Sequence, residues 1–268
     1  MVLNFSLTLI DNPQLESLEG LQNISEIATG VLLQQNDALV NLNGLQNIQH
    51  LSGNGLLIGS NQGLISLEGL NNLVESQSIE ITSNSQLSSI SALASLTTIQ
   101  SRLEVSGNNL LANLNGLDNV SSSNFDVKIT NNYELSSISS LSNISQINSL
   151  TIYGNEELSS LTGLEGLTTI TGNLYVGSGI YSTIDALQNV TTIGDLEISG
   201  LDFLTNLDGL VNVSSIDSDI EIRSCDALVD FCGLTNVITS GNFNGTYDVG
   251  SNAYNPTQQD IIEGNCSQ

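Results

Sequence analysis

The sequence predicts a mainly β protein, a parallel β-solenoid of ten to eleven rungs of about 24 residues with a short C-terminal capping helix. Three observations lead to this fold class: a repeat of 22 to 25 residues, strand-like alternation at the start of each copy, and a helix signal in the tail of the 268-residue chain. We expect one domain, in which residues 1–252 form the solenoid and residues 253–268 form its cap.

Most copies of the repeat open with an apolar, polar, apolar triplet, as in Ile79-Glu80-Ile81 and Leu150-Thr151-Ile152. This alternation is typical of a strand with one buried face. Ten copies begin at Leu7, Val31, Leu56, Ile79, Leu103, Val127, Leu150, Leu174, Leu196 and Ile220, and residues 247–252 form a degenerate eleventh copy.

An asparagine follows the strand at a fixed position, three residues after the second apolar residue. It is present in seven copies, at Asn12, Asn36, Asn61, Asn84, Asn108, Asn132 and Asn155. A recurring Asn at the end of a strand indicates a buried amide that bonds turn backbone in its own and neighbouring rungs.

The rest of each copy has an apolar residue at every third position, as in Leu158, Leu161 and Leu164. Gly, Ser, Thr and Asn fill the intervening positions and are poor helix formers, so we expect a coil that bends at corners. One such copy cannot bury its own apolar side, and the copies must therefore stack into a continuous core.

The tail carries the signals of a cap. Asn255 stands where a helix N-cap is expected, Pro256 at the first helical position and Gly264 at the stop. We expect a disulfide between Cys232 and Cys266 and a buried free thiol at Cys225, which falls at the asparagine position of its copy. Such a disulfide would indicate an oxidising compartment.

One copy of the repeat contains Leu196-Glu197-Ile198, Leu204, Leu207, Asp208-Gly209-Leu210, Asn212-Val213 and Ile216. This pattern resembles a known family, the receptor L domain, and the resemblance covers residues 7 to about 252. The family's leucine-rich-repeat-like solenoid occurs in insulin and epidermal-growth-factor receptors, in fungal cell-wall proteins and in secreted bacterial proteins. The resemblance implies a right-handed β-helix with three short parallel sheets and a role in adhesion or ligand binding. The chain lacks the receptors' Cys-rich modules and is closest in regularity to the bacterial members.

The charge balance excludes several partners. There are 28 acidic and 3 basic side chains, a formal net charge of −25, and the basic residues are Arg102, Lys128 and Arg223. Nucleic-acid binding depends on Lys and Arg, so we expect no nucleic-acid partner. We also expect no membrane insertion, because there is no apolar run of membrane-spanning length. A secreted or cell-surface monomer is the expectation, although residues 1–10 lack the features of a signal peptide.

The outward strand positions contain an acidic column. Glu197, Glu221 and Asp248 are expected on successive rungs, where like charges repel. Arg223 on the same face would relieve the repulsion, and a calcium ion held by the three carboxylates is an alternative. A solvated acidic face with no bound ion is the third interpretation, and no other cofactor is expected.

Aromatic residues are scarce and gather in the sixth to ninth copies, at Tyr133, Tyr153, Tyr175, Tyr181 and Phe203. Tyr153 and Tyr175 occupy outward positions on neighbouring strands. Together with Tyr133, Glu197, Glu221 and Arg223 they form the candidate ligand-binding site, since exposed rings anchor sugars and proteins. Tyr181 and Phe203 are expected to pack beneath a corner where the eighth copy is shortened.

These features predict a non-catalytic extracellular binding or adhesion module for a cell-surface protein or glycan. A structural spacer is an alternative function. A carbohydrate-active enzyme would use the stacked carboxylates, but a general acid with a buried carboxyl is not evident. Ice binding would use the Thr and Ser columns of the repeat, which are irregular.

The Asn-x-Ser/Thr triplets at Asn23, Asn119, Asn143, Asn189 and Asn212 share one repeat position, which favours a structural role over glycan attachment.

Overall fold

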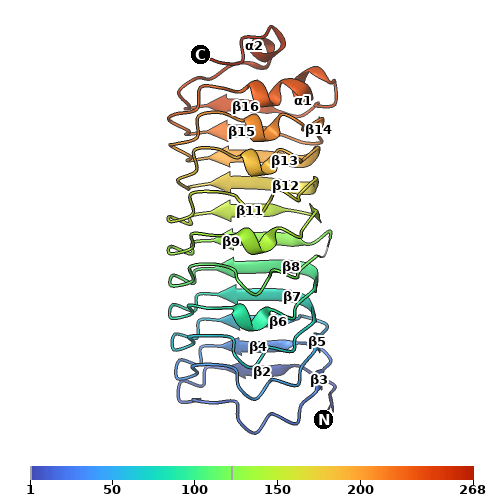
Figure 1. The fold of residues 1–268 in the computed structure, drawn as a ribbon, viewed down its shortest axis with the longest axis vertical. Coiled ribbons are helices and arrows are strands. Elements are labelled where there is room, and N and C mark those ends of the chain that lie inside the picture. Colours follow the sequence, from blue (N-terminus) through green and yellow to red (C-terminus); the bar gives the residue numbers. More distant parts are fainter. Residues whose placement is uncertain (1, 122) are drawn as a thin grey trace.

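The computed structural model describes residues 2–121 and 123–268 and shows a curved stack of rungs closed by a helix at its C-terminal end (Figure 1). The apolar triplets form a ladder of parallel strands in the expected register, with Leu7 opposite Val31 and Val31 opposite Leu56. The main ladder consists of β2 (Leu7–Ile10), β4 (Val31–Gln34), β6 (Leu56–Gly59), β7 (Glu75–Thr82), β8 (Thr98–Ser106), β9 (Asp126–Thr130), β11 (Leu150–Tyr153), β12 (Thr169–Gly177), β13 (Thr192–Ser199), β15 (Ile220–Arg223) and β16 (Tyr247–Gly250). The predicted solenoid, including the eleventh copy, is confirmed.

A second ladder runs along the adjacent side of the stack. It is built from short strands and from the first residues of β7, β8, β12 and β13, which continue around the corner into the main ladder through a bulge in two cases. The short strands are β1 (Val2–Leu3), β3 (Glu26–Ile27), β5 (His50–Leu51), β10 (Gln146–Ile147) and β14 (Ser215–Ile216).

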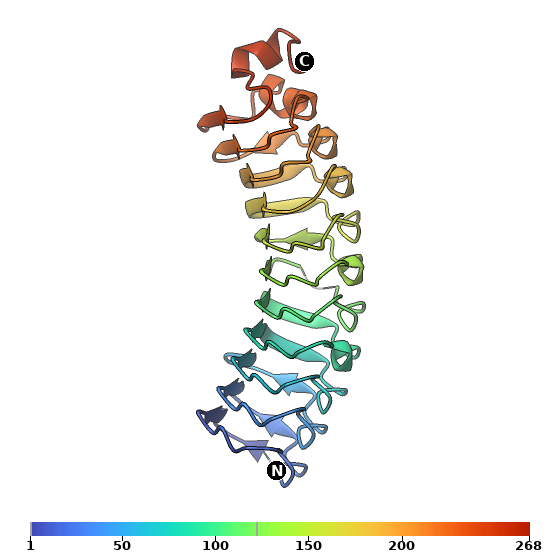
Figure 2. The ribbon, with the colours of Figure 1, turned by 90° about the vertical axis from the view of Figure 1, so that its left-hand side faces the viewer.

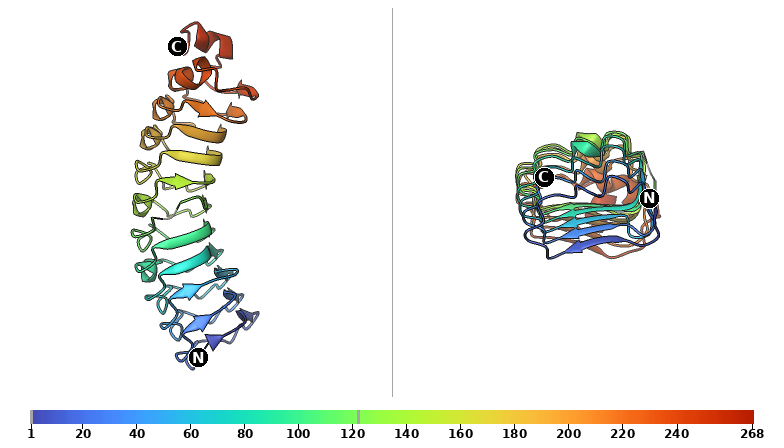
Figure 3. Two further views of the ribbon diagram at one scale, coloured as in Figure 1. Left: turned by 90° about the vertical axis from the view of Figure 1, so that its right-hand side faces the viewer. Right: turned by 90° about the horizontal axis from the view of Figure 1, so that it is seen from below.

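The third side differs from the three sheets that the resemblance implied. Single bridges join its rungs, such as Ser66 to Ser89 and Asn113 to Ser137. Short 3-10 helices form some of the turns that follow, at Ser91–Leu93, Ser139–Leu141, Asp185–Leu187, Asp208–Leu210 and Cys232–Leu234. Viewed along the axis, the strands form one flat side and these turns lie opposite (Figure 3).

The core is one continuous column of Leu, Ile and Val side chains, as the repeat predicts. Three larger side chains, Phe125, Tyr181 and Phe231, are also fully buried within it. Phe203, by contrast, is 59% exposed, so the expectation that it packs beneath a corner with Tyr181 is wrong for Phe203. The reason is that Leu201 and Leu204 on either side of it already fill the inward positions of that corner.

The predicted asparagine ladder is present and buried. Each backbone N–H donates to the side-chain Oδ1 of the next rung, as from Asn61 to Asn84 at 3.0 Å and from Asn84 to Asn108 at 3.1 Å. The ladder is interrupted after Asn155, where Gly179, Leu201 and Cys225 occupy the position, and Asn252 resumes it by accepting from the Cys225 N–H at 3.0 Å. Cys225 is a buried free cysteine, as expected.

The C-terminal cap comprises α1 (Thr235–Thr239) and α2 (Gln258–Ile262), which lie against each other. The N-cap of α2 is Thr257 and not Asn255 as expected, because Thr257 and Asp260 form a reciprocal capping box. The Asn255 side chain instead accepts from the backbone of Asn252, at 2.9 Å, and so extends the asparagine ladder.

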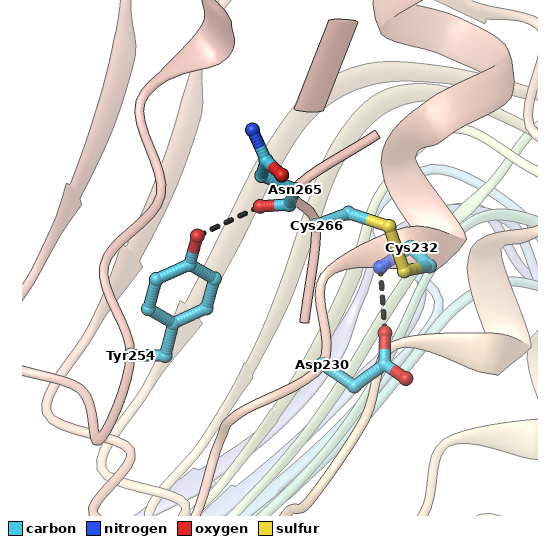
Figure 4. Close-up of a disulfide and its surroundings, with 5 residues drawn as sticks. All are labelled: Asp230, Cys232, Tyr254, Asn265 and Cys266. Carbon is cyan, nitrogen blue, oxygen red and sulfur yellow. Dashed lines mark hydrogen bonds between the residues drawn. A yellow bond between two sulfur atoms is a disulfide. The ribbon is translucent and has the colours of Figure 1, made fainter. Parts of the chain in front are cut away.

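The expected disulfide between Cys232 and Cys266 ties the chain end to the last rung (Figure 4). Around it, the Tyr254 hydroxyl donates to the Asn265 carbonyl at 2.7 Å and the Cys232 N–H donates to Asp230 at 2.8 Å. Burial of Ile261 completes the contact, so the C-terminal end of the core is covered.

Candidate binding site on the concave sheet face

The outward positions of the main ladder lie on the concave side of the curved solenoid (Figure 2). Strand pairing brings these positions together in columns, with Tyr175 opposite Glu197, Glu197 opposite Glu221, and Glu221 opposite Asp248. The predicted column is therefore continuous on one face, and the structure places most of the candidate residues along it.

Tyr153 and Tyr175 form an exposed aromatic pair on this face. Their ring centroids lie 5.6 Å apart with an interplanar angle of 29°, a stacked arrangement. Strand pairing sets Tyr153 opposite Gly177, so the contact with Tyr175 is diagonal. The sequence placed both rings outward on neighbouring strands, whereas their diagonal contact and stacked geometry were not evident from it.

Gly177 makes the stack possible. A Cβ atom at this position would lie 3.0 Å from both Cε2 and the hydroxyl oxygen of Tyr175, which shows that this end of the Tyr175 ring lies over the glycine. The Ser199 hydroxyl donates to the Tyr175 hydroxyl at 3.3 Å and holds the end of the ring. Partial burial raises the pKa of Tyr175 above its ordinary value. Tyr175 is therefore a fixed support, and Tyr153 is the more exposed ring of the pair.

Tyr133 does not join the pair. It lies on the corner after β9, where its side chain is 46% exposed and its carbonyl accepts from the Glu157 N–H. The expected group of three tyrosines is thus a stacked pair on the sheet and a separate tyrosine at the edge.

Arg223 neutralises two members of the acidic column, as one interpretation predicted. Its Nε lies 3.1 Å from Glu221 Oε1, and a second guanidinium nitrogen pairs with Asp248. Within residues 2–121 and 123–268, no group of three or more His, Cys, Asp or Glu has the arrangement of a metal site. The carboxylates proposed for calcium are already paired with an arginine in two of three cases.

Glu197 is the carboxylate of this column that Arg223 does not reach. Its pKa is raised above the ordinary value, first by partial burial and then by the charges of Glu221 and Asp195. This shift was not foreseen from the sequence, which indicated no carboxyl with a raised pKa. Partial burial in the stack and the neighbouring carboxylates account for the shift, and neither cause requires a catalytic role.

The other two basic residues also lie on this face. Lys128 Nζ is 3.0 Å from Glu104 and Arg102 is 3.5 Å from the same carboxylate. All three basic side chains of the protein are therefore used within the columns of the sheet, and the remaining carboxylates leave the face acidic.

Two exposed polar columns, the Thr and Ser column and the column of Asn-x-Ser/Thr asparagines, use their side chains for hydrogen bonds between rungs. The Thr168 and Thr191 hydroxyls donate to carbonyls of the preceding rung at 3.0 and 3.2 Å. The side-chain amides of the triplet asparagines do the same, from Asn119, Asn143, Asn189 and Asn212 at 2.6 to 2.8 Å. These bonds give both columns a structural role, and they leave fewer free hydroxyl donors for an ice-binding surface.

Sequence reasoning missed one part of the face, the outward residues Leu32 and Leu57. They are half-buried and line open hollows near the N-terminal end of the sheet. The signal was present in the sequence, because both are apolar residues in a column that is otherwise polar or aromatic.

No described helix is long and apolar enough to cross a membrane.

No protein-family model matches the chain, and no curated protein matches it either. Among solved structures, the fold is similar to an internalin from Listeria monocytogenes, with a TM-score of 0.58 and 21% sequence identity over 93% of this chain and 68% of the internalin. At this identity the likeness concerns the fold alone, and the receptor L domain resemblance stays a prediction. The chain thus has an internalin-like leucine-rich-repeat solenoid fold.

Proposed function

We propose that this chain is a non-catalytic extracellular or cell-surface module that binds a protein or glycan ligand on the concave face of its sheet. The observation that carries the proposal is the stacked pair of Tyr153 and Tyr175, in which Tyr153 is 37% exposed. Exposed aromatic rings held in one orientation lose little conformational freedom on binding and are frequent anchors of interfaces.

The surroundings of the pair support a binding role. The rings stand on paired strands, Tyr175 lies on Gly177, and the acidic residues Glu197 and Glu221 continue the same column. A ligand that covers the rings would reach these carboxylates on the next two rungs, about 5 and 10 Å away at the strand spacing. The internalin-like fold is a fold typical of protein-binding surface modules, which favours a macromolecular ligand. The disulfide supports an oxidising, extracellular location.

The test compares aromatic variants in glycan-array and cell-binding assays. We expect the Tyr153→Ala/Tyr175→Ala double variant to lose binding by about tenfold or more, since it removes a central aromatic anchor. Phe203→Ala is the control, because Phe203 is a ring that is 59% exposed, more than Tyr153, and lies on a turn outside the strands. Thermal unfolding of each variant establishes that the solenoid is intact. Binding that survives in the double variant would remove the tyrosine pair from the site.

A further inference from the structure

A groove lies on the concave face near its N-terminal end, well away from the tyrosine pair. Three open hollows of about 410, 130 and 60 Å³ adjoin one another there, and Leu57 lines all of them. Leu32 lines two of the three and stands opposite Leu57 on the neighbouring strand. Leu32 and Leu57 therefore form an apolar patch on the floor of the groove, while polar side chains line most of the largest hollow.

Glycines beside the two leucines explain the hollows. Gly59 occupies the outward position that follows Leu57 on β6, and Gly30 precedes Leu32 by two residues. Neither contributes a side chain to cover its neighbour. At Gly177 the equivalent space is filled by the Tyr175 ring, whereas near Gly59 the closest side-chain atom is Oγ1 of Thr82, 3.0 Å from where a Cβ would lie. The groove beside Leu57 is thus open to a ligand side chain.

A carboxylate without a partner borders the apolar floor. Glu80 pairs in register with Leu57 on one side and with Glu104 on the other, and its side chain lines two of the hollows. Glu104 is neutralised by Lys128 and Arg102. Among the described residues, Glu80 takes part in none of the ion pairs, although it is half-buried. Arg102 also lines the largest hollow, but it pairs with Glu104 and not with Glu80, so the half-buried Glu80 favours a cation supplied from outside.

We propose that Leu32, Leu57 and Glu80 form a second docking site, which takes a basic and apolar segment of a partner protein. An aliphatic side chain of the segment would lie on Leu32 and Leu57, and an adjacent Lys or Arg would reach Glu80. Charge complementarity supports this occupant, because the chain carries a formal net charge of −25 and would repel an acidic segment. No aromatic ring lines the hollows, so a sugar would lack a stacking surface there.

The docking site is independent of the tyrosine pair. Four strand steps separate β6 from β11, which carries Tyr153, and this corresponds to about 20 Å at the strand spacing. The two sites share a face but no residue.

Binding of a labelled model peptide tests the proposal on the whole chain. The probe is a capped, fluorescein-labelled peptide of four Leu-Lys repeats, measured by fluorescence anisotropy, with a Ser-Lys peptide of equal charge as the comparison. We expect the Leu-Lys peptide to bind at least about tenfold more tightly, since only it can bury an aliphatic side chain. Equal binding of the two peptides would show attraction to net charge alone and would overturn the proposal.

Variants locate the site. Leu57→Ser should weaken Leu-Lys binding about tenfold through the lost apolar contact, and Glu80→Gln by about three- to tenfold through the lost charge-assisted bond. The matched controls are Ile65→Ser, at a 53% exposed aliphatic residue outside the strands, and Glu134→Gln, at an exposed carboxylate on a corner. Both should bind as wild type. If Leu57→Ser and Ile65→Ser bind equally well, the groove is not the site.

Gly59→Leu blocks the groove and keeps both the leucines and the charge. Gly59 does not have a positive φ, so a side chain is tolerated there with a small shift of Thr82. We expect this variant to lose Leu-Lys binding while its unfolding midpoint is unchanged. The Tyr153→Ala/Tyr175→Ala variant should retain this binding, and its loss there would place the peptide on the tyrosine pair instead.

Discussion

At the scale of single residues, the buried asparagines hold successive rungs in register. The Asn108 side chain donates to the carbonyls of Ile81 at 2.8 Å and Ser106 at 3.2 Å, and its Oδ1 accepts from the backbone N–H of Asn84 at 3.1 Å. One amide thus bonds backbone groups of two rungs, and it is the acceptor for the buried N–H of Asn84, whereas the Ser106 carbonyl also accepts from the Ser83 N–H at 2.8 Å.

Replacement of this residue is expected to be costly. Asn108→Ala removes these bonds and leaves the buried backbone N–H of Asn84 without its acceptor, so it should lower the free energy of unfolding by about 2 to 3 kcal/mol. Asn109→Ala is the matched control, since Asn109 is only half-buried and lies outside the ladder; its effect should stay within about 0.5 kcal/mol. Urea unfolding of both variants provides the measurement, and similar midpoints would contradict a role of the amide in stability.

Glu197 makes the stability depend on pH. Its folded-state pKa lies above the ordinary value of 4.5, because burial and the charges of Glu221 and Asp195 disfavour the ionised form. At a pH between the unfolded-state and the folded-state pKa of Glu197, the native state binds more protons than the unfolded state. The contribution of Glu197 to the free energy of unfolding is therefore present at low pH and is lost as the pH rises through that window.

We therefore expect Glu197→Gln to unfold at a higher temperature than wild type at neutral pH. The difference should shrink towards zero below the ordinary pKa of 4.5, where both chains are uncharged at this position. The side chain is only partly buried and solvent still screens its charge, so the gain should not exceed about 1 kcal/mol. Thermal midpoints measured across this pH range, with Glu134→Gln as an exposed control, test the sign of the effect.

At the scale of elements, the residue at one corner selects the local turn. Gly44, Gly69, Gly116 and Gly163 have positive φ and a tight turn, whereas the copies with Ala92, Ser140 or Ala186 at this position form a 3-10 helix. Only glycine adopts that positive φ without strain, and a Cβ at Gly116 would lie 2.5 Å from the Ile90 carbonyl of the preceding rung. Gly209 and Gly233 also lie in 3-10 helices, so glycine permits the tight turn without imposing it.

The cap depends on its disulfide. The bond closes a segment of 34 residues between Cys232 and Cys266, and the loss of such a constraint costs about 3 to 4 kcal/mol in the chain-entropy description. We expect a reductant to lower the unfolding midpoint of wild type and to increase hydrogen exchange in α2. Cys225→Ala should respond to the reductant as wild type does, because Cys225 is unpaired. The Cys232→Ala/Cys266→Ala variant should not respond. If a reductant also lowered the unfolding midpoint of this variant, the effect on wild type could not be assigned to the disulfide, and the prediction that the bond secures the cap would be contradicted.

At the scale of the whole molecule, the stacking of the rungs arranges the many acidic side chains in rows. Core positions admit Leu, Ile and Val, so the carboxylates stand on outward strand positions, corners and the tail. Repulsion within these rows is only partly relieved, because the three basic residues pair with Glu104, Glu221 and Asp248.

Salt should consequently stabilise the solenoid. Raising NaCl from about 10 mM to about 500 mM shortens the screening length severalfold and should raise the unfolding midpoint. Calcium chloride at matched ionic strength should raise it no further, because Arg223 already pairs with Glu221 and Asp248. A larger shift with calcium that a chelator reverses would contradict this expectation and indicate a metal site.

The sequence by itself determined the architecture of this protein. The repeat has an alternating triplet, an asparagine at a fixed position and an apolar residue at every third position. A chain with this pattern can bury its apolar side chains only by stacking its copies. The spacing of the copies then sets the strand registers. The pairing of Cys232 with Cys266 was also predictable, because both fall near the end of the last rungs.

Only the tertiary structure decided how the surface is used. Whether Tyr153 reaches Tyr175 depends on a diagonal contact over Gly177, and whether Leu57 is covered depends on the side chains across Gly59. The partner of Arg223, the raised pKa of Glu197 and the N-cap at Thr257 likewise depend on distances between side chains. A repeat fixes the backbone through many identical contacts, whereas a binding site depends on the few positions at which neighbouring rungs differ.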